Sequence, residues 1–322
     1  MPSGEDDLIA RYFKPLATDP GALGLTDDAA FLKGGGDDLV VTTDAIVEGV
    51  HYLIGDPPDT IAKKALRVNL SDLAAKGATP AGFVLTLALR EVNEQWLAPF
   101  AQGLGGDAAM FHCPLLGGDT VSTPGPLTIS ITAFGRVPPG GLVKRTSARP
   151  GDRIVVSGTI GDAALGLAFL SGKMTADDAA REALIGRYRV PQPRVGLATA
   201  VQKYARAAMD VSDGLAGDLA KLCAASGVSA AIDAGAVPFS DAARGLIARG
   251  RSAFEIAVSG GDDYEILCTI PDERLDAFVK AAGEAGVAVT PIGRIVDGHA
   301  SPRWSDAEGR EIVLPRLSYS HF

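Results

Sequence analysis

The sequence has few cysteines, no long apolar run and no basic tract, and each absence argues against a class of protein. Cys113, Cys223 and Cys268 are odd in number and widely spaced, which argues against a disulfide framework or a zinc site and favours a reducing cytoplasm. No apolar stretch reaches the length of a membrane span, and the acidic start MPSGEDDLIARYF is not typical of a targeting peptide. A net charge of -9 makes nucleic acid and anionic membranes unexpected partners.

The sequence also lacks the short motifs of several large enzyme classes. It contains no G-x-x-x-x-G-K-[ST] loop and no nucleophile elbow, and its one glycine cluster of the dinucleotide type, GLGGDAA, follows a predicted helix instead of a strand. Histidine occurs only four times. A single histidine is more often structural or exposed than catalytic, so histidine-based acid–base chemistry is not indicated.

Aspartate, in contrast, is abundant and recurs at particular places. Of the 39 acidic residues, 28 are Asp and 11 are Glu. Many of these aspartates lie at or near the end of an apolar run: Asp27, Asp28, Asp44, Asp119, Asp210, Asp213, Asp262 and Asp263. Asp72 lies within the predicted helix NLSDLAAKG. Strand ends converge at one edge of a sheet, and clustered carboxylates repel one another unless a cation lies between them. Because no cluster of cysteines or histidines lies beside these acids, the expected ion is Mg²⁺, Mn²⁺ or Ca²⁺, and hydroxyls at Thr42, Thr43, Ser71 and Ser212 offer further ligands.

A simpler interpretation of each acid stays open. A single Ser-Asp pair at a helix start, such as Ser212-Asp213, is most often a helix cap. Turn or cap roles are preferred for Asp152 and Asp162, and Asp218 is expected to be solvated. The repetition of the pattern along the chain, more than any single residue, favours a metal site.

Apolar periodicity predicts alternating strands and helices in both halves of the chain, hence α/β or α+β layers. Strands are predicted at 29–32, 39–43, 82–90, 114–117, 127–137, 153–157, 207–210, 228–233, 254–258, 264–270 and 287–296. Helices are predicted at 5–17, 60–76, 94–110, within 161–207, at 213–225, between 233 and 254, and at 273–285. A Pro- and Gly-rich stretch predicts a linker at 139–152, between an N-terminal domain of residues 1–138 and a C-terminal α/β domain of residues 153–322.

Taken together, the motifs resemble those of the thiamine-monophosphate kinases, a family within the superfamily of aminoimidazole ribonucleotide synthetase, selenophosphate synthetase and the hydrogenase-maturation dehydratase. The matching stretches run in order along the whole chain: DDAA (27–30), VVTTDAIVEGVHY (40–52), NLSDLAAKGATP (69–80), LLGGDT (115–120), KRTSARPGD (144–152), MDVSDGLAGDL (209–219), SGGDDYEIL (259–267) and YSHF (319–322). Two departures occur: Thr26 replaces the family's usual Gly, and Asp262 its usual Glu.

The resemblance implies a fold and a set of residue roles. It implies a two-domain α/β fold in which the N-terminal domains, which bind ATP and Mg²⁺, pair into a β-barrel in a homodimer. The implied ligands of several Mg²⁺ ions are Asp27, Thr42, Thr43, Asp44, Asp72, Asp119, Asp210 and Asp213. The implied ATP contacts are Gly118, Asp119, Arg145 and Ser212, and the implied contacts to thiamine monophosphate are His51, Asp263 and Tyr319.

The implied activity is ATP-dependent phosphorylation of thiamine monophosphate to thiamine diphosphate by direct in-line transfer, the last step of thiamine diphosphate biosynthesis. The acceptor is a phosphate oxygen that is already mostly anionic at neutral pH, because its second pKa is about 6, so no general base is required. Two alternatives stay open: a sister ATPase with another acceptor, or a non-catalytic sensor of nucleotide or metal. The first cysteine, Cys113, lies far from the N-terminal position where selenophosphate synthetases carry their reactive residue.

Overall fold

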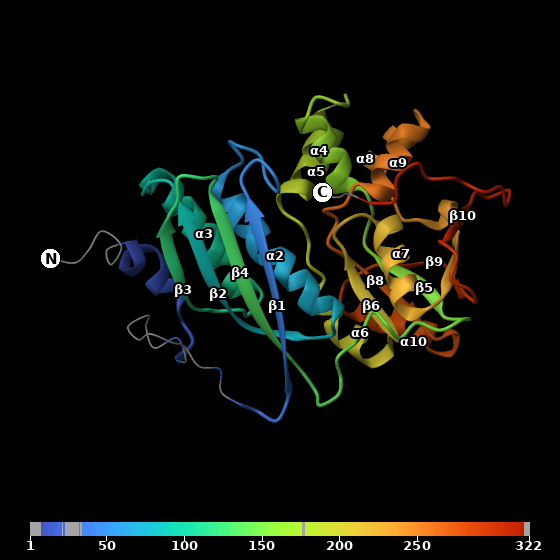
Figure 1. Cartoon of the computed structure of the whole chain (residues 1–322), viewed down its shortest axis with the longest axis horizontal. Coiled ribbons are helices and arrows are strands. Elements are labelled where there is room, and N and C mark those ends of the chain that lie inside the picture. The colour runs from blue at the N-terminus through green and yellow to red at the C-terminus, as the bar shows by residue number, and fades with distance from the viewer. Residues whose placement is uncertain (1–7, 21, 23–31, 33, 176–177, 319–322) are drawn as a thin grey trace. The chain divides into compact units, whose positions relative to one another are not determined.

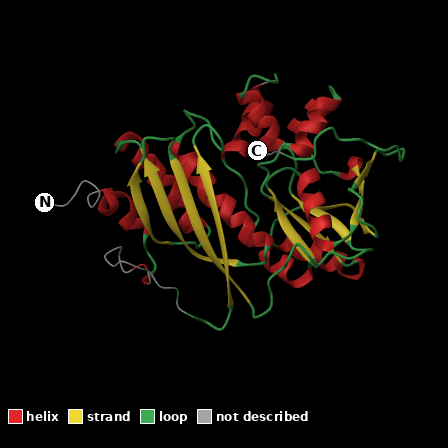
Figure 2. Ribbon diagram, in the orientation of Figure 1, coloured by secondary structure: helices red, strands yellow, loops and turns green. Residues whose placement is uncertain are grey.

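The structure, a computed structural model, describes the chain except for residues 1–7, 21, 23–31, 33, 176–177 and 319–322. It divides into two compact units, the first made of residues 1–73 and 78–140 and the second of residues 74–77 and 141–322. Each unit is a layered arrangement of one sheet and its helices (Figure 2). In the described part of the chain, no helix combines the length and the apolar character needed to cross a membrane.

The first unit is built on a four-stranded sheet with the order β1-β4-β2-β3. Its strands are β1 (Asp38–Val47), β2 (Thr79–Leu89), β3 (Leu115–Ser122) and β4 (Thr128–Val137). The central strand β4 runs antiparallel to β1 and β2, whereas β2 and β3 are parallel. Figures 1 and 2 show the helices α2 (Pro58–Ala75) and α3 (Glu94–Met110) on one side of this sheet. A π-helix (Ile9–Phe13) and a 3₁₀ turn (Lys14–Leu16) precede it, in agreement with the helix predicted over the described part of 5–17.

Alternation along the strands determines which side chains enter the core of this unit. Ile129, Ile131 and Ala133 of β4 are buried, while the residues between them are partly exposed. Successive side chains of a strand point to opposite faces of the sheet. The buried series therefore marks the face that α2 and α3 cover, and the other series marks an open face.

The second unit is built on a six-stranded sheet with the order β10-β7-β9-β5-β8-β6. The strands are β5 (Arg153–Ser157), β6 (Ala207–Val211), β7 (Ser229–Asp233), β8 (Glu265–Ile270), β9 (Val289–Val296) and β10 (Arg303–Ser305). The helices are α4 (Asp162–Leu170), α5 (Asp178–Arg189), α6 (Ala198–Tyr204), α7 (Leu215–Ser226), α8 (Asp241–Ile247), α9 (Arg251–Ser259) and α10 (Leu275–Glu284). The neighbouring strands β5, β8 and β6, of which β6 is at the edge of the sheet, are almost wholly buried, and apolar clusters lie on both faces of the sheet.

The structure confirms most of the predicted elements and corrects two. The segment 254–258, predicted as a strand because FEIAV is short and apolar, lies within α9. Its buried residues Ala253, Ala257 and Val258 follow helical spacing, and the hydroxyl of Ser259 bonds back to the carbonyl of Glu255. The short strand β10 was not predicted, because three residues give too little periodicity to detect. The predicted strand at 29–32 falls almost entirely outside the described residues.

Candidate functional site

In the first unit, strand β1 and helix α2 bring three of the predicted metal-site residues together. The hydroxyl of Thr42 donates a hydrogen bond of 2.5 Å to a carboxylate oxygen of Asp72. Thr42 and Asp44 are two residues apart on β1 and share its helix-covered face. Asp72 reaches them from the last turns of α2. One strand and one helix thus supply two carboxylates and a hydroxyl at the same place.

The electrostatics around Thr42, Asp44 and Asp72 favour a bound cation. The pKa of Asp44 is raised from its ordinary 3.8 to about 6, first because neighbouring atoms displace water from its carboxyl group and second because Asp72 repels its charge. Asp44 as a whole residue is still exposed to solvent. A bound divalent ion would relieve the repulsion between two such carboxylates. The donor set, carboxylate and hydroxyl oxygens, also fits Mg²⁺.

Thr43 and Asp119 lie on the other face of the sheet. The Thr43 hydroxyl donates to the carbonyl of Ile131 and accepts from the hydroxyl of Thr132. Asp119 is exposed on β3, opposite Thr86 of β2, in the row that continues through Ser130 of β4 to Ala45 of β1. Within one chain, Asp119 therefore lies on the opposite face from Asp44 and about three strand spacings away, roughly 14 Å.

Gly118 and His51 are held by backbone contacts. A Cβ atom on Gly118 would lie only 2.0 Å from the carbonyl oxygen of Leu85, so β2 and β3 can approach this closely only if residue 118 is glycine. The Nδ1 atom of His51 accepts a hydrogen bond of 3.1 Å from the amide of Val47, and its carbonyl accepts one of 2.9 Å from the ammonium of Lys64. The neutral ring consequently carries its proton on Nε2.

In the second unit, the turn between β6 and α7 holds the other predicted acids. Asp210 is buried at the end of β6, and Asp213 lies three residues later, with its side chain 37% exposed. The prediction that Asp218 is solvated was wrong: its side chain is fully buried. One of its oxygens accepts the amides of Ser212 and Asp213, at 3.0 and 2.9 Å. Lys221, which the sequence gave no reason to select, contacts both Asp213 and Asp218.

The segment before β8 closes over this turn in an unusual backbone conformation. Gly261, Asp262 and Tyr264 all have positive φ, at 85°, 65° and 51°. The amides of Asp262 and Tyr264 donate to the carbonyls of Ser212 and Val211, each at 2.8 Å. Left-handed conformations of non-glycine residues cost energy and cluster at functional sites. The turn is thus held through its amides by Asp218 and through its carbonyls by this segment.

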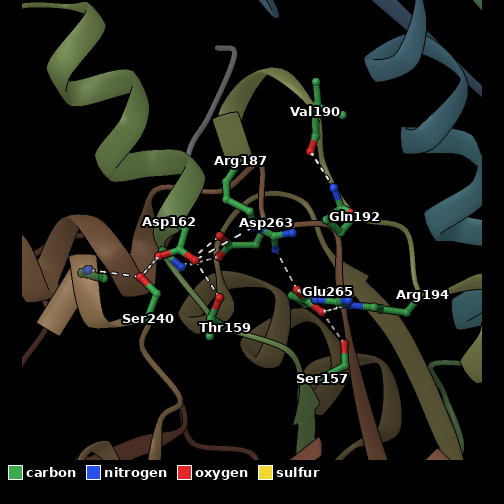
Figure 3. Close-up of polar contacts among 12 residues, drawn as sticks. Ser157, Thr159, Asp162, Arg187, Val190, Gln192, Arg194, Ser240, Asp263 and Glu265 are labelled. Carbon is green, nitrogen blue, oxygen red and sulfur yellow. Dashed lines mark hydrogen bonds and ion pairs between the residues drawn. The ribbon is translucent and has the colours of Figure 1, made fainter. Parts of the chain in front are cut away.

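Asp263 belongs to a buried polar cluster (Figure 3). Both of its carboxylate oxygens lie 2.9 Å from the amide of Gly161, at the start of α4. Its pKa is raised well above its ordinary value because burial removes the carboxyl from water, an effect that the Gly161 amide opposes and that nearby Asp162 strengthens. This carboxyl is therefore already hydrogen-bonded inside the fold. The predicted contact between Asp263 and a substrate stays a prediction.

Next to Asp263, the buried Glu265 is held by two arginines that were not predicted. Its carboxylate accepts hydrogen bonds from Arg187 at 2.8 Å, from Arg194 at 2.6 and 2.5 Å, and from Ser157 at 2.6 Å (Figure 3). A Glu within the apolar run EILCTI was the available signal, because buried charges require partners. These ion pairs fasten α5 and the following loop to the strand that begins at Glu265, and so support the segment that carries Asp262.

The structure gives little information on the remaining predicted residues, Arg145, Asp27 and Tyr319. Arg145 is exposed, and its carbonyl accepts the Ser226 hydroxyl at 2.8 Å. Asp27 and Tyr319 lie outside the described residues. Among the described residues, no group of three or more His, Cys, Asp or Glu side chains lies close enough to hold a metal ion unaided.

Comparison with known proteins decides the family. Residues 26–137 match the N-terminal domain of AIR synthase related proteins, and residues 149–304 match their C-terminal domain. The thiamine-monophosphate kinase of Caulobacter vibrioides is 44% identical over 326 residues, which cover 99% of this chain and 91% of that protein. The chain belongs to the thiamine-monophosphate kinase family. The resemblance identified from the motifs is thereby confirmed.

Solved structures of the family share the fold. The crystal structure of thiamine-monophosphate kinase from Stenotrophomonas maltophilia K279a is 40% identical and superimposes with a TM-score of 0.84, over 95% of this chain and 96% of that one. AaThiL complexed with AMPPCP and TMP is 32% identical, with a TM-score of 0.79 over 92% of this chain and 91% of that one. The predicted two-domain α/β architecture of the thiamine-monophosphate kinase family is therefore confirmed.

Proposed function

We propose that this chain is an ATP-dependent kinase that converts thiamine monophosphate to thiamine diphosphate, the last step of thiamine diphosphate biosynthesis. The observation that carries the proposal is the full-length match to thiamine-monophosphate kinases, together with the related structure that holds AMPPCP, an ATP analogue, and TMP. The match extends over both units, so it includes the acids of both.

The proposed reaction is a single in-line displacement. An anionic oxygen of the acceptor phosphate forms a bond to the γ-phosphorus of ATP while the bond from that phosphorus to the β,γ-bridging oxygen breaks, and ADP leaves with the electron pair. The acceptor is mostly dianionic at neutral pH. The protein therefore has to offset the repulsion between two polyanions; it does not have to remove a proton.

The proposed Mg²⁺ ligands divide between the units. In the first unit they are Asp27, Thr42, Thr43, Asp44, Asp72 and Asp119, and in the second Asp210 and Asp213. The raised pKa of Asp44 beside Asp72 supports this role, because these carboxylates repel each other without a cation. Bound Mg²⁺ would neutralise phosphate charge and polarise the transferred phosphoryl group. Thr42, by donating to Asp72, fixes the orientation of one ligand.

The remaining proposed contacts are to the two substrates. For ATP they are Gly118, Asp119, Arg145 and Ser212, and for thiamine monophosphate His51, Asp263 and Tyr319. The exposed guanidinium of Arg145 suits phosphate charge. An Nε2–H on His51 suits a phosphate or hydroxyl acceptor. The proposed location is the reducing cytoplasm, which the three buried and unpaired cysteines support.

We further propose that the protein works as a homodimer whose first units pair into a barrel. The open face of the four-stranded sheet carries the exposed apolar residues Leu39, Val41 and Val121. Both edge strands, β1 and β3, are unpaired on their outer side within the described chain. Pairing two sheets into a barrel removes both edges and covers apolar surface.

Phosphorus NMR of the purified protein with ATP, Mg²⁺ and thiamine monophosphate tests the proposed activity. We expect the signals of thiamine diphosphate and ADP to grow together and to stop growing when EDTA is added. ADP with free phosphate but no thiamine diphosphate would instead indicate an ATPase with another acceptor. An unchanged spectrum would favour a non-catalytic sensor and contradict the kinase assignment.

A further inference from the structure

The turn at the start of α7 is fixed by one buried carboxylate. Asp218 is fully buried, and its Oδ2 accepts both the Ser212 and the Asp213 amides. Backbone amides just before a helix are a common place for phosphate binding. Here the protein's own carboxylate takes both amides. These two amides are therefore not available to a phosphate group while Asp218 holds them.

The acids of this turn also contact the ammonium group of a lysine, Lys221. The Nζ atom of Lys221, one turn further along α7, lies 2.9 Å from Asp218 Oδ1 and 2.5 Å from Asp213 Oδ2. Two carboxylates in direct contact with this amine favour its charged ammonium form. The Lys221 ammonium therefore bridges the buried Asp218 and Asp213, whose side chain is 37% exposed.

We propose that Lys221 is a positioning residue that occupies Asp213 until a divalent cation arrives and that competes with this cation for the carboxylate. The inference rests on the proposed function, in which Asp213 is a Mg²⁺ ligand. When the metal binds, the ammonium leaves Asp213 and keeps its bond to Asp218. The buried Asp218 is thus never left without a counter-charge, whereas Asp213 exchanges one cation for another.

The strength of the competition follows from the exposure of the pair. The side chains of Lys221 and Asp213 are 43% and 37% exposed. Ion pairs of this kind contribute little, because water screens them. Removing the lysine charge should therefore tighten divalent binding at this turn by about two- to fivefold, and no more. Mg²⁺, with twice the charge, displaces the ammonium readily, so the lysine adjusts affinity without blocking the site.

Mn²⁺ binding, followed by electron paramagnetic resonance without nucleotide, tests the proposal. Lys221→Gln removes the charge but keeps an amide that can donate to Asp218, and Lys221→Met removes both. Lys280→Gln, an equal charge change on exposed α10, is the matched control. We expect Lys221→Gln to bind one Mn²⁺ more tightly, with Lys280→Gln unchanged. Unchanged or weaker binding in a Lys221→Gln protein of normal melting temperature would overturn the proposal, and so would the same result for Lys221→Met.

Two further measurements separate this inference from the proposed function. Asp213→Asn should lose the Mn²⁺ site that Lys221→Gln strengthens. If Asp213→Asn keeps every Mn²⁺ site of the wild-type protein, Asp213 is not a ligand and the competition does not exist. The phosphorus NMR assay of the same wild-type preparation reports the kinase separately. A working kinase with unaltered Mn²⁺ binding in Lys221→Gln rejects the lysine role alone, whereas an inactive wild type rejects the function.

Discussion

At the scale of single residues, Asp44 ties metal binding to the stability of the protein. Its pKa of about 6 in the folded protein exceeds the ordinary 3.8. The folded state therefore holds this proton more tightly than the unfolded state does. The stabilising contribution is present at low pH, decreases as the pH rises from about 4 to about 6, and is absent above that range. At neutral pH, the metal-free protein keeps a charge that the fold disfavours.

Asp44→Asn should consequently stabilise the metal-free protein while it removes a metal ligand. In EDTA at pH 8, we expect the variant to melt a few degrees higher than the wild type, and at pH 4 we expect the two to coincide. Added Mg²⁺ should raise the melting temperature of the wild type more than that of the variant. Differential scanning calorimetry measures both effects. An Asp44→Asn protein that melts lower than the wild type at both pH values would contradict this account.

Residue patterns predicted the site only in part, for a physical reason. Asp44 and Asp213 were selected because they follow apolar runs, and Asp72 because it lies in the predicted helix NLSDLAAKG. The structure places Asp44 and Asp72 together. Asp218 looked like a solvated helix residue. Its burial depends on the amides of a turn, which are the same in every sequence and leave no pattern. The partners of Glu265, Arg187 and Arg194, come from a distant part of the chain and are equally invisible to local reasoning.

At the scale of elements, β2 and β3 depend on a glycine that the sequence marked only as a ligand contact. Gly118→Ala would place a Cβ atom 2.0 Å from the Leu85 carbonyl, a backbone atom that cannot move without disturbing the sheet. We expect a loss of about 1–3 kcal/mol in the free energy of unfolding, as for other overpacked sites. Gly117→Ala is the matched control, because a Cβ atom there meets nothing within 4 Å.

Urea unfolding of both glycine variants measures the difference. Equal midpoints for Gly117→Ala and Gly118→Ala would show that the two strands separate easily and that residue 118 is glycine only for the sake of its ligand. More generally, the long helix α3 was predicted to the residue, because its helical pattern extends over 17 residues. The short apolar segment of α9 was not, because a run of five apolar residues fits a strand and a buried helix turn equally well.

At the scale of the whole molecule, sheet register determines which acids one chain can bring together. Asp44 lies on the helix-covered face of an edge strand, and Asp119 lies on the open face of the opposite edge. The period of two along a strand was available in the sequence, but the strand order β1-β4-β2-β3 was not, because it follows from long-range pairing. Because this register separates the two acids within one chain, we expect the second acid of a shared site to come from another copy of the chain.

Mixed dimers test whether Asp44 of one chain and Asp119 of the other serve the same site. Asp44→Asn and Asp119→Asn homodimers should each be inactive, because each lacks one ligand in both sites. A dimer that combines the two variants has one site with both substitutions and one with neither, so its activity should be about half that of the wild type. Co-expression with two different affinity tags isolates this heterodimer, and the phosphorus NMR assay measures its turnover. If Asp44 and Asp119 of the same chain acted together, both sites of the heterodimer would be impaired. An inactive heterodimer that elutes as a dimer would therefore contradict the shared site.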